Sequence, residues 1–227
     1  MFAVLDACAV INLLQAFDDD SYFGLIESEF TRVFIAQEKV IEEIHRNKYD
    51  NLLTPASKED ERSLQLRRQE IDDIISRRVR NYVFPKDTVE CQNFLSKATG
   101  YRKKNGEFYS VALSLYLSRM DGVEKICEQL LDVHFVTDDL GVSNDFGTFF
   151  RVNQIGNLID SIDIMTILYL RGRITKADLE NFCFTLKSLY SRTHAELIKR
   201  IKLAQNVEKD TRISSLLTSI VDYLVVR

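Results

Sequence analysis

Two short strand-like runs of this chain each stop at acidic residues. The run Phe2–Leu5 is followed by Asp6, and the run Val133–Thr137 is followed by Asp138 and Asp139. Runs of this length are typical of buried strands, and ligands of open α/β sheets bind at the carboxyl ends of the strands. Carboxylates gathered at one such edge repel each other unless a cation neutralises them. The pattern therefore predicts a site for a hard divalent ion, Mg²⁺ or Mn²⁺.

Two glutamates extend this acidic set. Glu43 lies in a helical segment just after a further apolar run, residues 32–35, and Glu107 follows Gly106 at the start of another helical segment. Each lies next to the apolar face of its helix rather than opposite it. Each acid of the set also has an ordinary explanation, as an N-cap, a solvated side chain, a partner of the helix dipole or a loop residue. Their joint occurrence favours the metal site.

The elements that must position these acids alternate between strands and helices. Strands are expected at 2–6, 32–35, 133–137 and 151–155, and helices at 8–17, 21–30, 37–45, 57–82, 88–98, 107–119 and 123–131, with only helix from 157 onward, broken near 172 and 206. Each expected strand is an apolar run, which favours parallel strands that are buried on both faces. The expected fold class is α/β, with a short parallel sheet between two helical layers.

Length, composition and charge exclude several classes of protein. The chain has 227 residues, of which 45% are hydrophobic and 28% are charged, and this is ordinary for a globular protein. The net charge of −4 indicates no general attraction to nucleic acid, so any such binding must come from local patches. Four scattered cysteines without a CxxC pair indicate reduced thiols, a cytoplasmic location and no structural zinc site. We expect no signal peptide and no membrane span.

Taken in order, the acidic segments resemble the PIN domain, a family of metal-dependent ribonucleases. The resemblance rests on Val4–Leu13, the Val-x-x-Glu-Ile block around Glu43, the Gly-Glu-(x)4-Ala block from Gly106, and Val136–Asp139. It covers residues 1–45 and 105–172, and the segment 154–186 also resembles the C-terminal part of some PIN toxin-like proteins. Cys8 is a departure, because many members of the family have a hydroxyl residue two places after the first Asp.

The resemblance implies hydrolysis of RNA phosphodiesters with Mg²⁺ or Mn²⁺ as the cofactor. The metal ligands that it implies are Asp6, Glu43, Glu107 and Asp139. Asp138 would be an alternative ligand or a group that supports the ligands, and Thr137 and Asn12 would orient ligands or water. In two-metal sites the ions lie about 3.5–4 Å apart, one activating water and the other stabilising the leaving oxygen.

The resemblance also implies a domain organisation. A PIN-like domain would span residues 1–172 with a helical insertion at about 46–104, and residues 173–227 would form a helical extension. The insertion returns to the domain through Arg102, Lys103 and Lys104, just before Glu107, which predicts that this loop contacts RNA phosphates. A solvated loop is the alternative. We interpret the apolar stripe at 213–224 as packing within the chain, with a homodimer or a partner groove as the alternative.

Other functions fit the residues less well. A haloacid-dehalogenase-like phosphatase needs a second Asp where this chain has Cys8, and a dinucleotide-binding enzyme needs glycines that residues 6–14 lack. The serious alternative is a catalytically silent PIN-like scaffold that binds proteins, but the presence of all four acids favours the enzyme. The expected role is a toxin of a toxin–antitoxin or phage-defence system, with an antitoxin or other regulatory protein as partner.

Overall fold

The computed structural model describes residues 2–16, 21–30, 32–46, 65–66, 69, 72–73, 88–119 and 133–190. Its sheet consists of β1 (Phe2–Leu5), β2 (Arg32–Ile35), β3 (Val133–Val136) and β4 (Gly156–Ile159). All neighbours are parallel, in the order β2-β1-β3-β4. The expectation of an α/β fold with a short parallel sheet is confirmed, and the first three predicted strands lie where they were expected.

The fourth strand lies after the segment predicted for it. Residues 151 and 152 still belong to helix α7 (Leu140–Val152), and Gln154 then takes a positive φ of 50° to reverse the chain. The strand begins at Gly156, which has a φ of 140° and where a Cβ atom would collide with the carbonyl oxygen of Val133. Only glycine fits this close approach to Val133. Gly156 is therefore the first residue of β4, whereas the prediction placed it after the end of the strand. The prediction of a strand at 151–155, with only helix after 157, is therefore wrong.

The register of the sheet aligns the carboxyl ends of its strands. Leu5 pairs with Ile35 on one side and with Val136 on the other, and Val136 pairs with Ile159. The ladder continues one residue further, since the Asp6 N–H donates to the Val136 carbonyl oxygen at 3.0 Å. The residues that directly follow the four strands therefore lie along one edge of the sheet.

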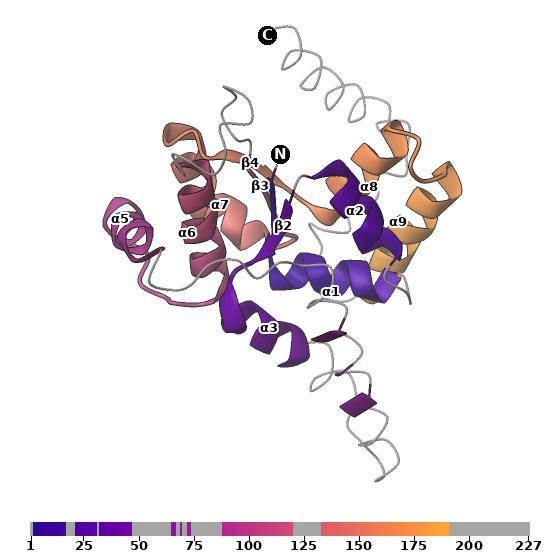
Figure 1. Cartoon of the computed structure of the whole chain (residues 1–227), viewed down its shortest axis with the longest axis horizontal. Helices are drawn as coiled ribbons and strands as arrows, with labels where there is room; N and C mark the ends of the chain where they lie inside the picture. Colours follow the sequence, from indigo (N-terminus) through magenta and orange to yellow (C-terminus); the bar gives the residue numbers. More distant parts are fainter. Residues whose placement is uncertain are drawn as a thin grey trace, which may run out of the picture. The chain divides into compact units, whose positions relative to one another are not determined.

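Helices cover both faces of the sheet. They are α1 (Ala7–Ala16), α2 (Ser21–Glu29), α3 (Gln37–His45), α5 (Val89–Thr99), α6 (Gly106–Ser118) and α7. In Figure 1, α1 and α2 lie on one side of the strands, and α5, α6 and α7 lie on the other. Helix α6 packs against β1 and β3, and α7 packs against β4. All four residues of β1 are buried, as expected for a strand between two helical layers.

The order of the strands produces a topological switch between β1 and β3. The chain leaves β1 through α1 and α2 towards β2, and it leaves β3 through α7 in the opposite direction, towards β4. Because such crossovers are almost always right-handed, two that run in opposite directions cover opposite faces. The carboxyl ends of β1 and β3 therefore border the crevice in which open α/β sheets bind their ligands.

The chain divides into two compact units, residues 1–161 and 162–227. The second unit contains most of α8 (Ser161–Leu170), and α9 (Lys176–Tyr190) follows after a turn at Gly172, near the predicted break. Residues 65–66, 69 and 72–73 are helical, as predicted for 57–82. The rest of that helix, the helix at 123–131 and the stripe at 213–224 lie outside the described residues. Among the described helices, none is long and apolar enough to cross a membrane.

Candidate active site

Asp6 occupies the carboxyl end of β1 and is almost completely buried, with 3% of its surface exposed. Its Oδ2 accepts hydrogen bonds from the Thr137 hydroxyl at 3.1 Å and from the Cys8 thiol at 3.4 Å. Its Oδ1 is buried without a hydrogen-bond partner. Burial raises the pKa of Asp6 from 3.8 to about 7; hydrogen bonds from the Ala7 backbone, Cys8 and Thr137 oppose this shift, and the charge of Glu107 adds to it. A cation at Oδ1 would remove the cost of this unpaired oxygen.

Thr137 and Cys8 connect the two strand ends. The N–H of Asp139 donates to the Thr137 hydroxyl, and the N–H of Asp138 donates to the Cys8 sulfur, each at 3.2 Å. Burial raises the pKa of Cys8, and the charges of Asp6 and Asp138 raise it further, so the thiol is neutral and able to donate. A neutral buried thiol is a packing group and a weak donor, not a nucleophile.

The neighbours Asp138 and Asp139 have different surroundings. Asp138 accepts hydrogen bonds on both oxygens, from the Asn12 amide at 2.6 Å and from the Ser161 N–H at 3.0 Å. Asp139 caps α7, because its Oδ1 accepts the Gly141 N–H at 2.7 Å. Asn12 therefore orients Asp138. Through its two hydrogen bonds, Asp138 connects α1 with Ser161, which lies just after β4. Asp139 also interacts with the carboxylate of Glu107, at the start of α6.

Glu107 lies in the first turn of α6 and is held by two donors. Its Oε2 accepts the Tyr101 hydroxyl at 3.0 Å and the Asn105 amide at 3.1 Å. Burial raises the pKa of Glu107; these two hydrogen bonds lower it, and the neighbouring Asp139 carboxyl raises it again. Asp6 also feels the charge of Glu107. Glu107 is thus the carboxylate that links the ends of β1 and β3.

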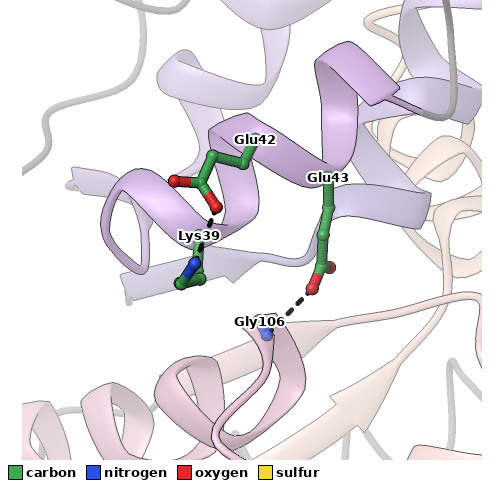
Figure 2. A network of polar contacts seen from close by, with 4 residues as sticks. All are labelled: Lys39, Glu42, Glu43 and Gly106. Atoms are coloured by element: carbon green, nitrogen blue, oxygen red, sulfur yellow. Dashed lines mark hydrogen bonds and ion pairs between the residues drawn. The ribbon is translucent and has the colours of Figure 1, made fainter. Parts of the chain in front are cut away.

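Glu43 contacts the beginning of α6. Its Oε1 accepts the Gly106 N–H at 3.1 Å, and Figure 2 shows this side chain reaching from α3 to the first residue of α6. A Cβ atom at position 106 would stand 2.6 Å from Oε2, so glycine leaves the room that this carboxylate needs. Its neighbour Glu42 points to solvent and pairs with Lys39 at 2.8 Å. The two adjacent glutamates therefore have different roles.

The five acids differ in how their oxygens are occupied. Asp138 has a donor on each oxygen, whereas a donor holds one oxygen in each of the other four, which are Asp6, Glu43, Glu107 and Asp139. Such an arrangement fixes each side chain through one oxygen, and Glu107 and Asp139 also hydrogen-bond to each other. As placed, no group of three or more His, Cys, Asp or Glu side chains within the described residues could hold a metal ion. The structure brings these acids together in pairs, Asp6 with Glu107 and Glu107 with Asp139.

The basic loop, residues Arg102 to Lys104, is exposed beside this site. It joins α5 to α6 and stands between Tyr101 and Asn105, the two residues that hydrogen-bond to Glu107. Its three cations therefore lie within a few residues of the acids. This position suits a loop that attracts a polyanion to the site.

The structure also contains site residues that sequence reasoning missed. Asp160 follows β4 at the same edge as Asp6 and is 1% exposed. The segment Leu158-Ile159-Asp160 repeats the pattern of an apolar run that stops at an acid, and that signal was present in the sequence. Tyr101 and Asn105 gave no such signal, because the residues that they contact are known only from the folded chain.

Comparison of the chain with protein-family models, with curated proteins and with solved structures finds no match.

Proposed function

We propose that this chain is a metal-dependent endoribonuclease of the PIN type, with Asp6, Glu107 and Asp139 as metal ligands. The observation that carries the proposal is Asp6, a buried acid at the topological switch whose Oδ1 has no partner and whose pKa is about 7. A carboxylate that is costly in the metal-free protein is typical of a group tuned for function. The order of the acids along the chain, which resembles the PIN domain, gives the reaction class.

The chain's own residues would share the work as follows. Thr137 and Cys8 hold Oδ2 of Asp6, which leaves Oδ1 for the ion. Glu43 fixes the start of α6 through one oxygen, and its other oxygen would be the fourth ligand. Asp138 supports this edge of the sheet instead of binding the ion. When bound, Mg²⁺ or Mn²⁺ would activate water and neutralise charge on the phosphate.

The basic loop would supply the attraction that the acidic chain lacks as a whole. The net charge is −4, and a site lined with carboxylates repels RNA further. Arg102, Lys103 and Lys104 are exposed next to that site, where cations can bind the phosphates that flank the scissile bond. Single-stranded or looped RNA is the expected substrate, because its backbone can enter a crevice at a sheet edge.

The decisive experiment is cleavage of single-stranded RNA by the purified full chain in Mn²⁺. We expect activity that EDTA abolishes and that is absent from Asp6→Asn and Glu107→Gln. The control is Glu42→Gln, which removes an exposed acid on α3 and should leave activity unchanged. Cleavage that persists in EDTA or in Asp6→Asn would overturn the proposal. A wild-type chain that neither binds Mn²⁺ nor cleaves RNA would favour the protein-binding scaffold.

The proposed biological role is that of a cytoplasmic toxin or a phage-defence effector. Expression of the wild-type chain should then arrest growth, and Asp6→Asn should relieve the arrest. An antitoxin would be encoded by a small neighbouring reading frame that restores growth when it is co-expressed. Growth that is unaffected by the active enzyme would leave a ribonuclease with another role.

A further inference from the structure

Tyr101 precedes the basic loop and contacts Glu107, one of the acids at the carboxyl edge of the sheet. Its hydroxyl donates to Glu107 Oε2 at 3.0 Å, and the Asn105 amide lies 3.3 Å from the same hydroxyl and 3.1 Å from the same carboxylate oxygen. The three side chains therefore form a closed set of hydrogen bonds around one oxygen. Two donors to one oxygen define the direction of the whole carboxylate.

The ring of Tyr101 is fixed independently of its hydroxyl. It stacks on Phe108 of α6 with the ring planes 8° apart, and its centroid is 4.8 Å from that of Phe146 of α7. Both phenylalanines are fully buried. Helix α6 carries Glu107 and α7 is capped by Asp139, so the same ring is packed against both helices that bring acids to this edge.

The backbone on both sides of this contact is also defined. Helix α5 ends at Gly100, which has a φ of 70°, and the Tyr101 N–H then donates to the Thr99 hydroxyl at 3.1 Å. At the other end, Asn105 caps α6 by accepting the Phe108 N–H at 3.2 Å. A single left-handed residue and an N-cap are common ways to set the direction of a chain between two helices. Little freedom remains at the position of the phenol.

We propose that Tyr101 is a positioning residue for the metal site: it holds Oε2 of Glu107 and so fixes the direction from which this proposed ligand would meet the ion. The proposal rests on the proposed function, because it concerns one of the proposed ligands. Groups that hydrogen-bond to a metal ligand fix its orientation, and their loss typically costs about 10–100-fold in metal affinity or activity. In this role Tyr101 acts through Glu107 and does not bind the ion itself.

The test is Tyr101→Phe in the full chain, which removes the hydroxyl and keeps the ring on Phe108 and Phe146. Tyr116→Phe is the matched control, since Tyr116 is half-buried on α6 away from Glu107. Mn²⁺ binding is measured by titration calorimetry, and unfolding is measured in EDTA. We expect Tyr101→Phe to weaken Mn²⁺ binding about 10-fold or more, with an unfolding midpoint like that of the control.

A second background shows whether Tyr101 acts through Glu107. In Glu107→Gln, the added change Tyr101→Phe should not weaken Mn²⁺ binding further, because residues that act as one unit are not additive. If the wild type binds Mn²⁺, two results would overturn the positioning role and leave the metal site standing. One is a further loss of Mn²⁺ affinity when Tyr101→Phe is added to Glu107→Gln, and the other is wild-type Mn²⁺ affinity in Tyr101→Phe alone. Absence of Mn²⁺ binding by the wild type would overturn both the site and this role.

A spectroscopic readout is available because the chain has no Trp, so tyrosines are the sensitisers of bound Tb³⁺. The Tyr101 hydroxyl bonds directly to a proposed ligand, so this phenol should sensitise a Tb³⁺ ion at the site. We expect Tyr101→Phe to lose most of the luminescence at saturating Tb³⁺, and Tyr116→Phe to keep it. Equal luminescence in the two variants would contradict the placement of Tyr101 beside the ion site.

Discussion

The burial of Asp6 predicts how the stability of the metal-free protein depends on pH. The pKa of this carboxyl is about 7 in the folded chain, against an ordinary value of 3.8 that represents the unfolded chain. Between these values the folded chain holds the proton and the unfolded chain releases it. The stability that comes from this difference is therefore complete below about pH 4 and is lost as the pH rises through about 7. Above that pH, folding requires a buried and unneutralised carboxylate.

The magnitude follows from the shift. A rise of the pKa from 3.8 to about 7 means that ionisation of Asp6 costs about 4 kcal/mol more in the folded chain than in the unfolded chain. Asp6→Asn removes the ionisation and hardly changes the volume. The new amide N–H₂ has no acceptor at the position of Oδ1, which costs about 1–3 kcal/mol. We therefore expect metal-free Asp6→Asn to be more stable than the wild type at pH 8 by about 1–3 kcal/mol.

The assay is urea unfolding in EDTA at pH 4.5 and at pH 8, followed by circular dichroism. The advantage of Asp6→Asn should be present at pH 8 and absent at pH 4.5. The control Asp145→Asn, at an exposed position on α7, should show no such dependence. Adding Mn²⁺ at 100 times its Kd should stabilise the wild type by about 2.7 kcal/mol and leave Asp6→Asn unchanged.

Two results would refute this reasoning. One is a metal-free Asp6→Asn that is no more stable than the wild type at pH 8. The other is an advantage of the same size at both pH values, because the effect would then come from packing and not from ionisation. Either result would mean that Asp6 is not the strained acid that the proposed function requires.

The remaining predictions concern the two sides of the site. Glu43→Gln should destabilise the chain by about 1–2 kcal/mol in thermal unfolding, because it weakens a charge-assisted bond to the Gly106 N–H, whereas Glu42→Gln should change stability by no more than about 0.5 kcal/mol. Replacing Arg102, Lys103 and Lys104 by Ala should weaken RNA binding and flatten its salt dependence, with Mn²⁺ affinity unchanged. An unchanged salt slope in filter binding would make this loop a solvated connection only.

The sequence predicted the acidic ends of β1 and β3 better than it predicted the start of β4. Asp6 and Thr137 follow short, mostly apolar runs, and such runs are typical of buried strands. The segment before β4 is different, because its apolar residues lie outside the strand: Val152 still belongs to α7 and Ile155 precedes β4. The start of that strand depends on a close approach to the Val133 carbonyl, and the sequence shows no more of this than a glycine.

The roles of the individual acids depend on partners that are far away in the chain. Asp138 and Asp139 are chemically identical neighbours, and the sequence left open which of them is the main ligand. The structure separates them through Asn12, 126 residues away, which donates to Asp138. Residue type and order therefore identify the set of acids, but only tertiary contacts decide which oxygens remain available.

The same contacts explain why the departure at Cys8 is compatible with the proposed site. A hydroxyl two places after the first Asp would hold that carboxylate, and in this chain the hydroxyl comes from Thr137 at the end of the neighbouring strand. The thiol of Cys8 adds a weaker hydrogen bond to the same oxygen and accepts the Asp138 N–H. Because β1 and β3 pair in register, their ends can supply either group at the same place. The chemical requirement is a hydrogen-bond donor at Oδ2 of Asp6. The residues after β1 and the residues after β3 can each supply this donor.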